Sequence, residues 1–300
     1  MKLIFAISII ILLGSIESLN AQENVIYGSD NRFEVRDYDN SQFIEKARSV
    51  ALRVPSRRLT IDRENPTLLN FPQITLIQST PSLCSTERFL DQVQLGNCSG
   101  FLVAADKIMT AGHCVFSKRD CESHKWVFDY QEGTEKIQIQ NTYSCKKVIV
   151  QKYHYSATEV ADYAVIQLDR PVRDRQPLAT RKLGVPFYNT PLVLIGHPLG
   201  LPMKIADGAR VTMPNQEERK NLVHSLMLRK NYFTANLDAY AGNSGSPVFN
   251  QITGKVEGVL VQGADDYAIE AEDSCIKSAH RGNKAKEAEE KVMRVTKIHY

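Results

Sequence analysis

The sequence predicts an all-β fold, either a sandwich or a barrel of antiparallel strands. From about Phe71 onward, short apolar runs recur that are rich in Val, Ile, Leu and Phe, among them "ITLIQ", "SGFLVA", "YAVIQL" and "KVEGVLVQG". Turn residues separate these runs, which favours antiparallel sheets over alternating β and α units. The 300 residues, 43% of them hydrophobic, are enough to bury a large core.

Charge and composition narrow the classes of partner. The formal net charge is +3, and residues of both signs are interspersed along the chain. This excess is too small to indicate a nucleic-acid or membrane partner. No internal repeat and no low-complexity tract is visible, so a solenoid or a disordered chain is not expected.

The first element in chain order is a short apolar segment. Lys2 precedes an apolar run from Leu3 to Leu13, and small and polar residues follow as far as Ala21. The run is shorter than the roughly 20 residues of a membrane span, and the layout is that of a secretory signal peptide. We expect residues 1–21 to be removed near Ala21, although Leu19 is bulky for such a site. A membrane anchor that is never cleaved is the alternative. The mature protein should be secreted or periplasmic, without membrane attachment.

Residues 22–70 form a polar and charged segment that could include a propeptide. It carries an early turn signal, "YGSDN", and the dibasic pair Arg57-Arg58, which is either a processing site or an uncut surface pair. The stretch "SQFIEKARSVALRV" mixes helical and strand periodicity and is not assigned. At the other end of the chain, "KAKEAEEKVMRVTKI" is the clearest helix candidate. We expect it to form a single C-terminal helix that closes the all-β domain.

Six cysteines follow the predicted signal peptide. An even number in an exported chain favours disulfides over free thiols. There is no Cys-x-x-Cys pair, and no set of ligands at zinc spacing surrounds His113-Cys114. We therefore expect neither a structural metal nor a cofactor. The cysteines are Cys84, Cys98, Cys114, Cys121, Cys145 and Cys275.

Three polar residues stand in settings that suit nucleophilic catalysis. Ser244 lies among small residues in "AYAGNSGSPVFN", and a serine hydroxyl needs a base before it can attack. His113 in "MTAGHCV" could be that base, and Asp162 in "ADYAVIQLDRPV" could orient the imidazole. The order His113, Asp162, Ser244 excludes the α/β-hydrolase order, which is Ser, Asp, His, and the subtilisin order, which begins with Asp. The second glycine of the hydrolase elbow is also missing, because Ser246 stands there.

Together, "TAGHC", "DYAVIQL" and "GNSGSPVF" resemble the trypsin/chymotrypsin-like serine peptidases, most closely the bacterial glutamyl-endopeptidase (V8-like) branch. "VIYGSDNRFEV" (25–35) is similar to the start of mature enzymes in that branch, and "IGHPLGLPMK" (195–204) is another phrase of these chains. The resemblance covers roughly residues 25–300. It implies a peptidase domain over 71–300 with two antiparallel six-stranded β-barrels, at about 71–175 and 176–300. His113 and Asp162 would lie on the first barrel and Ser244 on the second.

The resemblance also implies a role for each residue. Ser244 would be the nucleophile, His113 the general base and then the general acid, and Asp162 the group that fixes the imidazole tautomer. The N–H groups of Gly242 and Ser244 would form the oxyanion hole, for which Gly242 supplies a permissive backbone. Animal digestive enzymes carry Asp immediately before the nucleophile, where this chain has Asn243. A neutral amide cannot pair with a newly cut N-terminus, so activation by that ion pair is not expected.

The resemblance implies one disulfide. In this family a disulfide joins the strands that here read "CSGFLV" and "TAGHC", which implies Cys98–Cys114. The other four cysteines allow three connectivities. Cys121–Cys145 is the local choice and leaves Cys84–Cys275.

Specificity is predicted from the pocket that the resemblance implies. Asp238, six residues before Ser244, would lie at the pocket base, with Leu260 and Gly263 also in contact with substrate. A buried carboxylate favours a cationic guest, and the segment 256–276 adds six acidic residues and no Lys or Arg, so cleavage after Arg or Lys is expected. Glutamate-specific relatives have a histidine about where Leu260 stands, which argues against glutamate preference. Tyr240 replaces a disulfide cysteine of trypsin, and Asp238 could instead cap a turn outside the pocket.

These observations predict a monomeric, secreted serine endopeptidase that acts on protein or peptide substrates through an acyl-enzyme. Three alternatives remain. The first is a catalytically silent binding module on the same fold, the second is a glutamyl-specific endopeptidase, and the third is an esterase-like hydrolase with the same triad.

Overall fold

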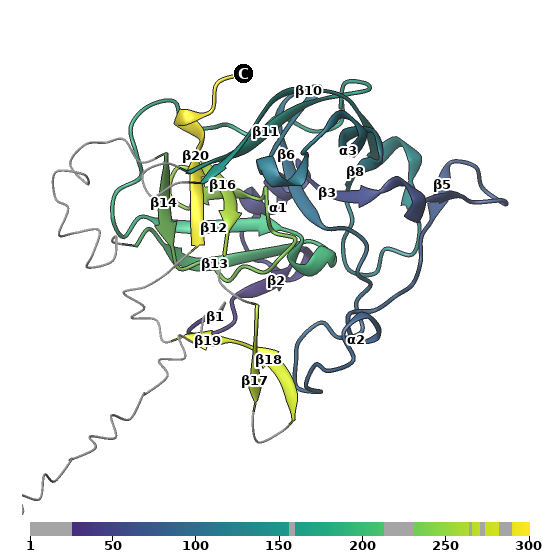
Figure 1. Cartoon of the computed structure of the whole chain (residues 1–300), viewed down its shortest axis with the longest axis horizontal. Helices are drawn as coiled ribbons and strands as arrows, with labels where there is room; N and C mark the ends of the chain where they lie inside the picture. Colours follow the sequence, from purple (N-terminus) through teal and green to yellow (C-terminus); the bar gives the residue numbers. More distant parts are fainter. Residues whose placement is uncertain (1–25, 156–159, 213–230, 264–265, 271–273, 282–289) are drawn as a thin grey trace, which may run out of the picture.

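The computed structural model of the chain describes residues 26–155, 160–212, 231–263, 266–270, 274–281 and 290–300. The predicted signal peptide, residues 1–21, lies outside the described residues. Figure 1 shows two curled sheets side by side, with a smaller hairpin below them. Among the described residues, no helix combines the length and the apolar character that a membrane crossing requires.

The first sheet is a closed barrel of six strands in the order β10-β11-β7-β6-β3-β8, and all neighbours are antiparallel. It begins earlier than the sequence predicted, because the first strand precedes Phe71. That strand, "VALRVP", is almost wholly buried, and its buried arginine, Arg53, pairs with Asp120. A buried, ion-paired arginine interrupts the continuous apolar run that would identify the strand. The strands are β3 (Val50–Pro55), β6 (Cys98–Ala104), β7 (Lys107–Thr110), β8 (His124–Phe128), β10 (Thr142–Tyr155) and β11 (Val160–Leu168).

The second sheet has seven strands in the order β14-β20-β16-β15-β12-β13-β2. An isolated bridge between Val211 and Ala235 joins the end of β13 to β14, and the Thr212 N–H donates to the Thr234 carbonyl at 2.9 Å. Six strands therefore curl into a second barrel, and β2 is added at its edge. The predicted all-β, two-barrel fold is confirmed. The strands are β2 (Arg32–Glu34), β12 (Pro191–Gly196), β13 (Lys204–Arg210), β14 (Tyr232–Ala235), β15 (Pro247–Asn250), β16 (Val256–Gln262) and β20 (Glu290–Arg294).

The predicted C-terminal helix is wrong where the structure describes it. Residues 282–289 lie outside the described residues, but Glu290–Arg294 form strand β20, and a 3-10 turn, η6 (Val295–Lys297), follows. β20 hydrogen-bonds to β14 on one edge and to β16 on the other, and Glu290 and Val292 are fully buried. Pairing on both edges outweighs the helix propensity of the residues, which is worth only tenths of a kcal/mol each.

The N-terminal part of the chain connects the two barrels. β1 (Ile26–Tyr27) pairs in parallel with β19 (His280–Arg281), and β2 then pairs with β13 before the chain enters the first barrel at β3. Helix α1 (Ser41–Ala47) lies between β2 and β3 in the chain. The side chain of Asn40 caps it by accepting a hydrogen bond from the Gln42 N–H. Residues 26–55 therefore belong to the folded domain.

Short elements complete the fold. A three-stranded sheet packs beside the first barrel, and β17 and β18 form a hairpin. The remaining elements are η1 (Val35–Asp37), η2 (Ser56–Arg58), β4 (Thr60–Ile61), β5 (Leu68–Asn70), α2 (Leu76–Ser79), η3 (Gly112–Cys114), α3 (Lys118–Glu122), β9 (Ile137–Gln138), η4 (Ile139–Asn141), η5 (Pro198–Gly200), β17 (Tyr267–Glu270) and β18 (Cys275–Ser278).

The largest hydrophobic cluster among the described residues spans both barrels. It includes Phe101 and Val165 of the first barrel with Ile195 and Phe249 of the second. Phe43 of α1 meets the ring of Phe249 edge-on at 5.7 Å, so the helix fills the junction. Because the core is shared, the barrels are packed as one body, and residues from both can meet at their junction.

Three disulfides brace this arrangement. The structure pairs Cys98 with Cys114, Cys121 with Cys145, and Cys84 with Cys275, which is the set that the sequence predicted. The first ties β6 to η3, the second ties α3 to β10, and the third closes a sequence separation of 191 residues.

Candidate active site

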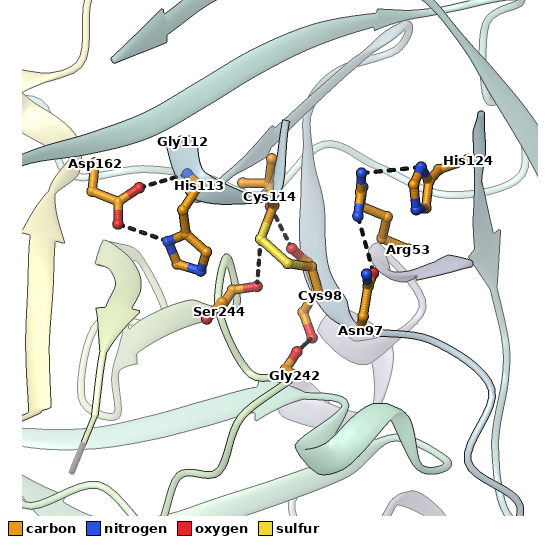
Figure 2. The surroundings of a disulfide bond; sticks show 12 residues. Arg53, Asn97, Cys98, Gly112, His113, Cys114, His124, Asp162, Gly242 and Ser244 are labelled. Atoms are coloured by element: carbon orange, nitrogen blue, oxygen red, sulfur yellow. Dashed lines mark hydrogen bonds and ion pairs between the residues drawn. A yellow bond between two sulfur atoms is a disulfide. The ribbon is translucent and has the colours of Figure 1, made fainter. Parts of the chain in front are cut away.

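The junction of the barrels brings together the three residues that the sequence singled out. His113 lies in η3, directly after β7, and Asp162 lies near the start of β11. Ser244 lies in the turn that precedes β15 of the second barrel. Figure 2 shows the imidazole of His113 between the carboxylate of Asp162 and Ser244.

Asp162 fixes the orientation of the histidine through two contacts. Its Oδ2 lies 2.7 Å from His113 Nδ1, and its Oδ1 accepts a hydrogen bond from the His113 backbone N–H at 3.0 Å. The side chain of Asp162 is fully buried, whereas that of His113 is 27% exposed. Because a carboxylate accepts, Nδ1 of the neutral imidazole donates, and Nε2 is left as the basic nitrogen.

The backbone around Ser244 is fixed from both barrels. The Ser99 N–H of β6 donates to the Ser244 carbonyl at 2.8 Å, and the Gly245 N–H donates to the Leu260 carbonyl of β16 at 2.7 Å. Gly245 has φ +89°, and a Cβ there would lie 2.1 Å from the Ser99 carbonyl oxygen. Only glycine fits this contact. No hydrogen bond joins Ser244 Oγ to His113 within the described part of the chain, as is common before substrate tightens such a site.

Two backbone N–H groups beside Ser244 are available to a reacting oxygen. The Ala241 carbonyl accepts from the Leu199 N–H, and the Asn243 carbonyl accepts from the Ser246 N–H. In a planar trans peptide the N–H points opposite to the carbonyl, so the N–H groups of Gly242 and Ser244 point away from those contacts. Neither N–H donates to another group among the residues that the structure describes. Gly242, at φ +87°, permits this conformation.

Sequence reasoning missed two residues that support the site. Ser99, fully buried in β6, accepts from the His197 N–H at 3.0 Å and donates to the Gly242 carbonyl at 2.9 Å. Tyr155 donates its hydroxyl to Asp162 Oδ2 at 2.6 Å. The polar Ser99 at the start of the apolar run "SGFLVA" is a signal in the sequence, since a buried hydroxyl requires partners. No local pattern indicated Tyr155.

Of the residues predicted to bind substrate, Asp238 lies against the N-terminal segment. The side chain of Asp238 is buried, and its two oxygens accept from the N–H groups of Tyr27 and Asn31, each at 2.9 Å. Burial raises the pKa of Asp238 to about 6, and the two backbone hydrogen bonds offset only part of this effect. Leu260 is buried in β16, and Gly263 lies just beyond that strand.

Potential metal ligands gather at one place among the described residues. They are Cys98, His113 and Cys114, and the two sulfur atoms are bonded to each other. A disulfide sulfur is not a thiolate and does not supply the ligand that a zinc site needs.

Comparisons with known proteins agree with this architecture. A sequence model described as a trypsin-like peptidase domain matches residues 98–259. The solved structure of the Vibrio cholerae VesB protease is similar at 14% identity and a TM-score of 0.50, covering 91% of this chain and 64% of that one. This chain therefore spans less than two thirds of the VesB structure.

Two further structures resemble the fold. A Glu endopeptidase in complex with MPD has 18% identity and a TM-score of 0.48, covering 85% of this chain and 94% of that one. The Rv3671c protease in its inactive form has 14% identity and a TM-score of 0.44, covering 85% and 88%. No curated protein sequence matches the chain significantly.

Proposed function

Because this chain belongs to the trypsin-like peptidase domain family, we propose that it is a serine endopeptidase that cleaves peptide bonds through an acyl-enzyme. The observation that carries the proposal is the geometry at the barrel junction. The His113–Asp162 pair, at 2.7 Å, leaves Nε2 on the side of Ser244, and the N–H groups of Gly242 and Ser244 beside it donate to no other group in the described part of the chain.

In this mechanism each group has one task. His113 Nε2 takes the proton of Ser244 Oγ as the oxygen attacks the scissile carbonyl carbon. The N–H groups of Gly242 and Ser244 bind the negative oxygen of the tetrahedral intermediate, and one such donor typically contributes about 3–4 kcal/mol to transition-state binding. The imidazolium, stabilised by Asp162, then protonates the leaving amine. Water then attacks the acyl carbon while His113 takes its proton. His113 returns that proton to Ser244 Oγ as the acyl group leaves.

Other parts of the prediction have uneven support. Three disulfides suit a secreted or periplasmic protein. Cleavage after Arg or Lys, which Asp238 predicts, has weaker support, because both carboxylate oxygens already accept backbone hydrogen bonds. A guest cation would need the remaining lone pairs. Leu260 offers no positive charge to a glutamate side chain. The glutamyl-specific alternative therefore has no more support than the preference for Arg or Lys.

The proposal is tested with Ser244→Ala. We expect the folded wild-type protein to react with a fluorophosphonate probe and to cleave a peptide library. Ser244→Ala should lose labelling, with kcat reduced by about 10⁶, because triad members act as a unit. Ser82→Ala, at an exposed serine, is the matched control and should label normally.

The outcomes separate the alternatives. A folded wild-type protein that neither labels nor cleaves is a silent binding module. Labelling with ester hydrolysis but no peptide cleavage identifies an esterase. Normal labelling of Ser244→Ala would refute Ser244 as the nucleophile.

A further inference from the structure

Three aromatic side chains form a row beside His113, and all of them reach solvent. The ring of Phe116 lies 5.2 Å from that of Tyr153, and Tyr153 lies 5.5 Å from Tyr155, both edge-on. Tyr153 also meets the His113 imidazole edge-on at 6.2 Å. Phe116 is 60% exposed, Tyr153 is 52% exposed and Tyr155 is 38% exposed. We call these three residues the aromatic row.

The row is built on hydrogen-bonded backbone. Tyr153 and Tyr155 are two residues apart on β10, so they share one face, and Tyr153 lies opposite Asp162 in the β10–β11 pair. The N–H of Phe116 donates to Asp120 Oδ2 at 3.0 Å, which fixes the segment after η3. Side chains held in this way lose little additional freedom when a ligand covers them.

We propose that the aromatic row is a subsite for a bulky apolar side chain of the substrate, within two residues of the scissile bond. This proposal rests on the proposed peptidase function. A catalytic imidazole must lie against the substrate on both sides of the scissile bond, so a neighbour of His113 is within reach of the adjoining residues. The exposed ring faces carry no charge and gain by burial against an apolar guest. A single exposed aromatic residue needs no functional explanation, but these three lie together and adjoin the candidate site.

A peptide library randomised at two positions on each side of the scissile bond tests the subsite. We expect Phe, Tyr or Leu to be enriched at one of these positions, outside the position that occupies the primary pocket. Tyr153→Ser should lower kcat/KM about tenfold or more for the best apolar peptide, and less than about twofold for the matching Ala peptide. Phe116→Ser provides a second variant, and Phe187→Ser, at an 81% exposed aromatic residue distant in sequence, is the control.

Equal losses for the apolar and Ala peptides, or no apolar enrichment with the wild-type enzyme, would overturn the subsite. These results differ from failure of the proposed function, in which the wild-type protein neither labels nor cleaves any peptide. Thermal melting of each variant shows whether it is folded before its kinetics are compared.

A separate observation concerns the hydroxyl of Tyr155. Asp162 Oδ2 accepts from both His113 Nδ1 at 2.7 Å and the Tyr155 hydroxyl at 2.6 Å, while the carboxylate is fully buried. A buried carboxylate depends on such donors to stay charged. Burial and the neighbouring carboxylate raise the pKa of Tyr155 well above its usual range, so the phenol remains a donor at all working pH values.

We infer that Tyr155 is a positioning residue that holds the Asp162 side chain oriented for His113. Among the residues that the structure describes, the titratable side chains facing Asp162 are Tyr153 and Tyr155 from β10 and His113 from η3. Lys152 and His154 alternate to the other face of β10, and Ser244 contributes no charge from its loop. The positive end of the Tyr155 hydroxyl dipole therefore acts directly on the Asp162–His113 pair.

Tyr155→Phe tests this role, because it keeps the ring and removes only the donor. We expect kcat to fall about tenfold with KM little changed, as for the loss of one hydrogen bond to a charged group. This fall in kcat comes from the lost orientation of Asp162. The acid limb of the kcat/KM profile should move to higher pH, because a carboxylate that is not shared with the phenol holds the proton on the resting His113 imidazole more tightly. Tyr143→Phe makes the same change at the distant start of β10 and should alter neither quantity. An unchanged kcat and acid limb in folded Tyr155→Phe would overturn the inference, even if its melting temperature fell.

Discussion

The carboxyl group of Asp238 is bound by chain segments that precede it by about 200 residues. Its partners, the N–H groups of Tyr27 and Asn31, lie 211 and 207 residues away. The six-residue spacing from Ser244 is a local pattern and carries no information about them. A sequence pattern can therefore place Asp238 near a pocket, but whether the carboxylate faces substrate depends on tertiary contacts. The Arg/Lys preference stays a prediction.

Buried Asp238 should make stability depend on pH. Its pKa, raised by burial to about 6, exceeds the ordinary value of 3.8 in the unfolded chain. The folded protein then holds the proton more tightly, so the contribution to the free energy of unfolding is greatest below pH ~4 and falls as pH rises through about 6. The full change is on the order of 3 kcal/mol.

Urea unfolding of the wild type and Asp238→Asn between pH ~4 and ~7 measures this effect. Asparagine does not titrate, so the difference between the two proteins isolates the carboxyl group. We expect the wild type to lose stability relative to the variant across this range. If the wild type kept the same stability relative to the variant, or gained stability relative to it as pH rises, the carboxyl would not be held in its neutral form.

At the scale of elements, the local sequence pattern predicts some strands and misses those that depend on tertiary pairing. The apolar runs "KIMTA" and "YAVIQL" correspond to β7 and most of β11, because buried strands are continuous apolar stretches. The sequence pattern does not predict β3, since the buried Arg53 interrupts its apolar run. The pattern predicts a helix where β20 lies, because the charged residues favour a helix and the strand partners lie far away in the sequence. The three residues of the candidate site, by contrast, are predicted from motifs that are each local in the sequence.

The Cys98–Cys114 bridge should support catalysis as well as stability. It ties β6 to η3, the turn that carries His113, over a sequence separation of 16 residues. Cys98→Ala/Cys114→Ala should lose about 3 kcal/mol of stability and most of its kcat, because η3 loses its anchor. Cys121→Ala/Cys145→Ala opens a loop of similar length, a separation of 24 residues, and should lose similar stability but less kcat. Equal kcat losses in the two variants would mean that the first bridge does not position His113.

At the scale of the whole molecule, the third disulfide spans most of the chain. Cys84–Cys275 links the segment before β6 to the hairpin strand β18, across 191 residues. In the chain-entropy model a longer closed loop restricts the unfolded state more, so this bridge should contribute about 5 kcal/mol. Cys84→Ser/Cys275→Ser should therefore unfold at a lower urea concentration than the Cys98→Ala/Cys114→Ala variant. The reverse order would show that strain or residual structure outweighs loop entropy here.

The pairing of β1 with β19 sets a sequence of events in folding. All six strands of the first barrel lie within residues 50–168 and can assemble as soon as that stretch has left the ribosome. β2 must wait for residues 204–206, and β1 must wait for residues 280–281. Of the strands that the structure describes, the first to be synthesised are therefore the last to dock, because distant pairings carry the largest loop-closure cost. In pulsed hydrogen exchange during refolding, we expect the amides of Ile26 and Tyr27 to gain protection after those of the first barrel.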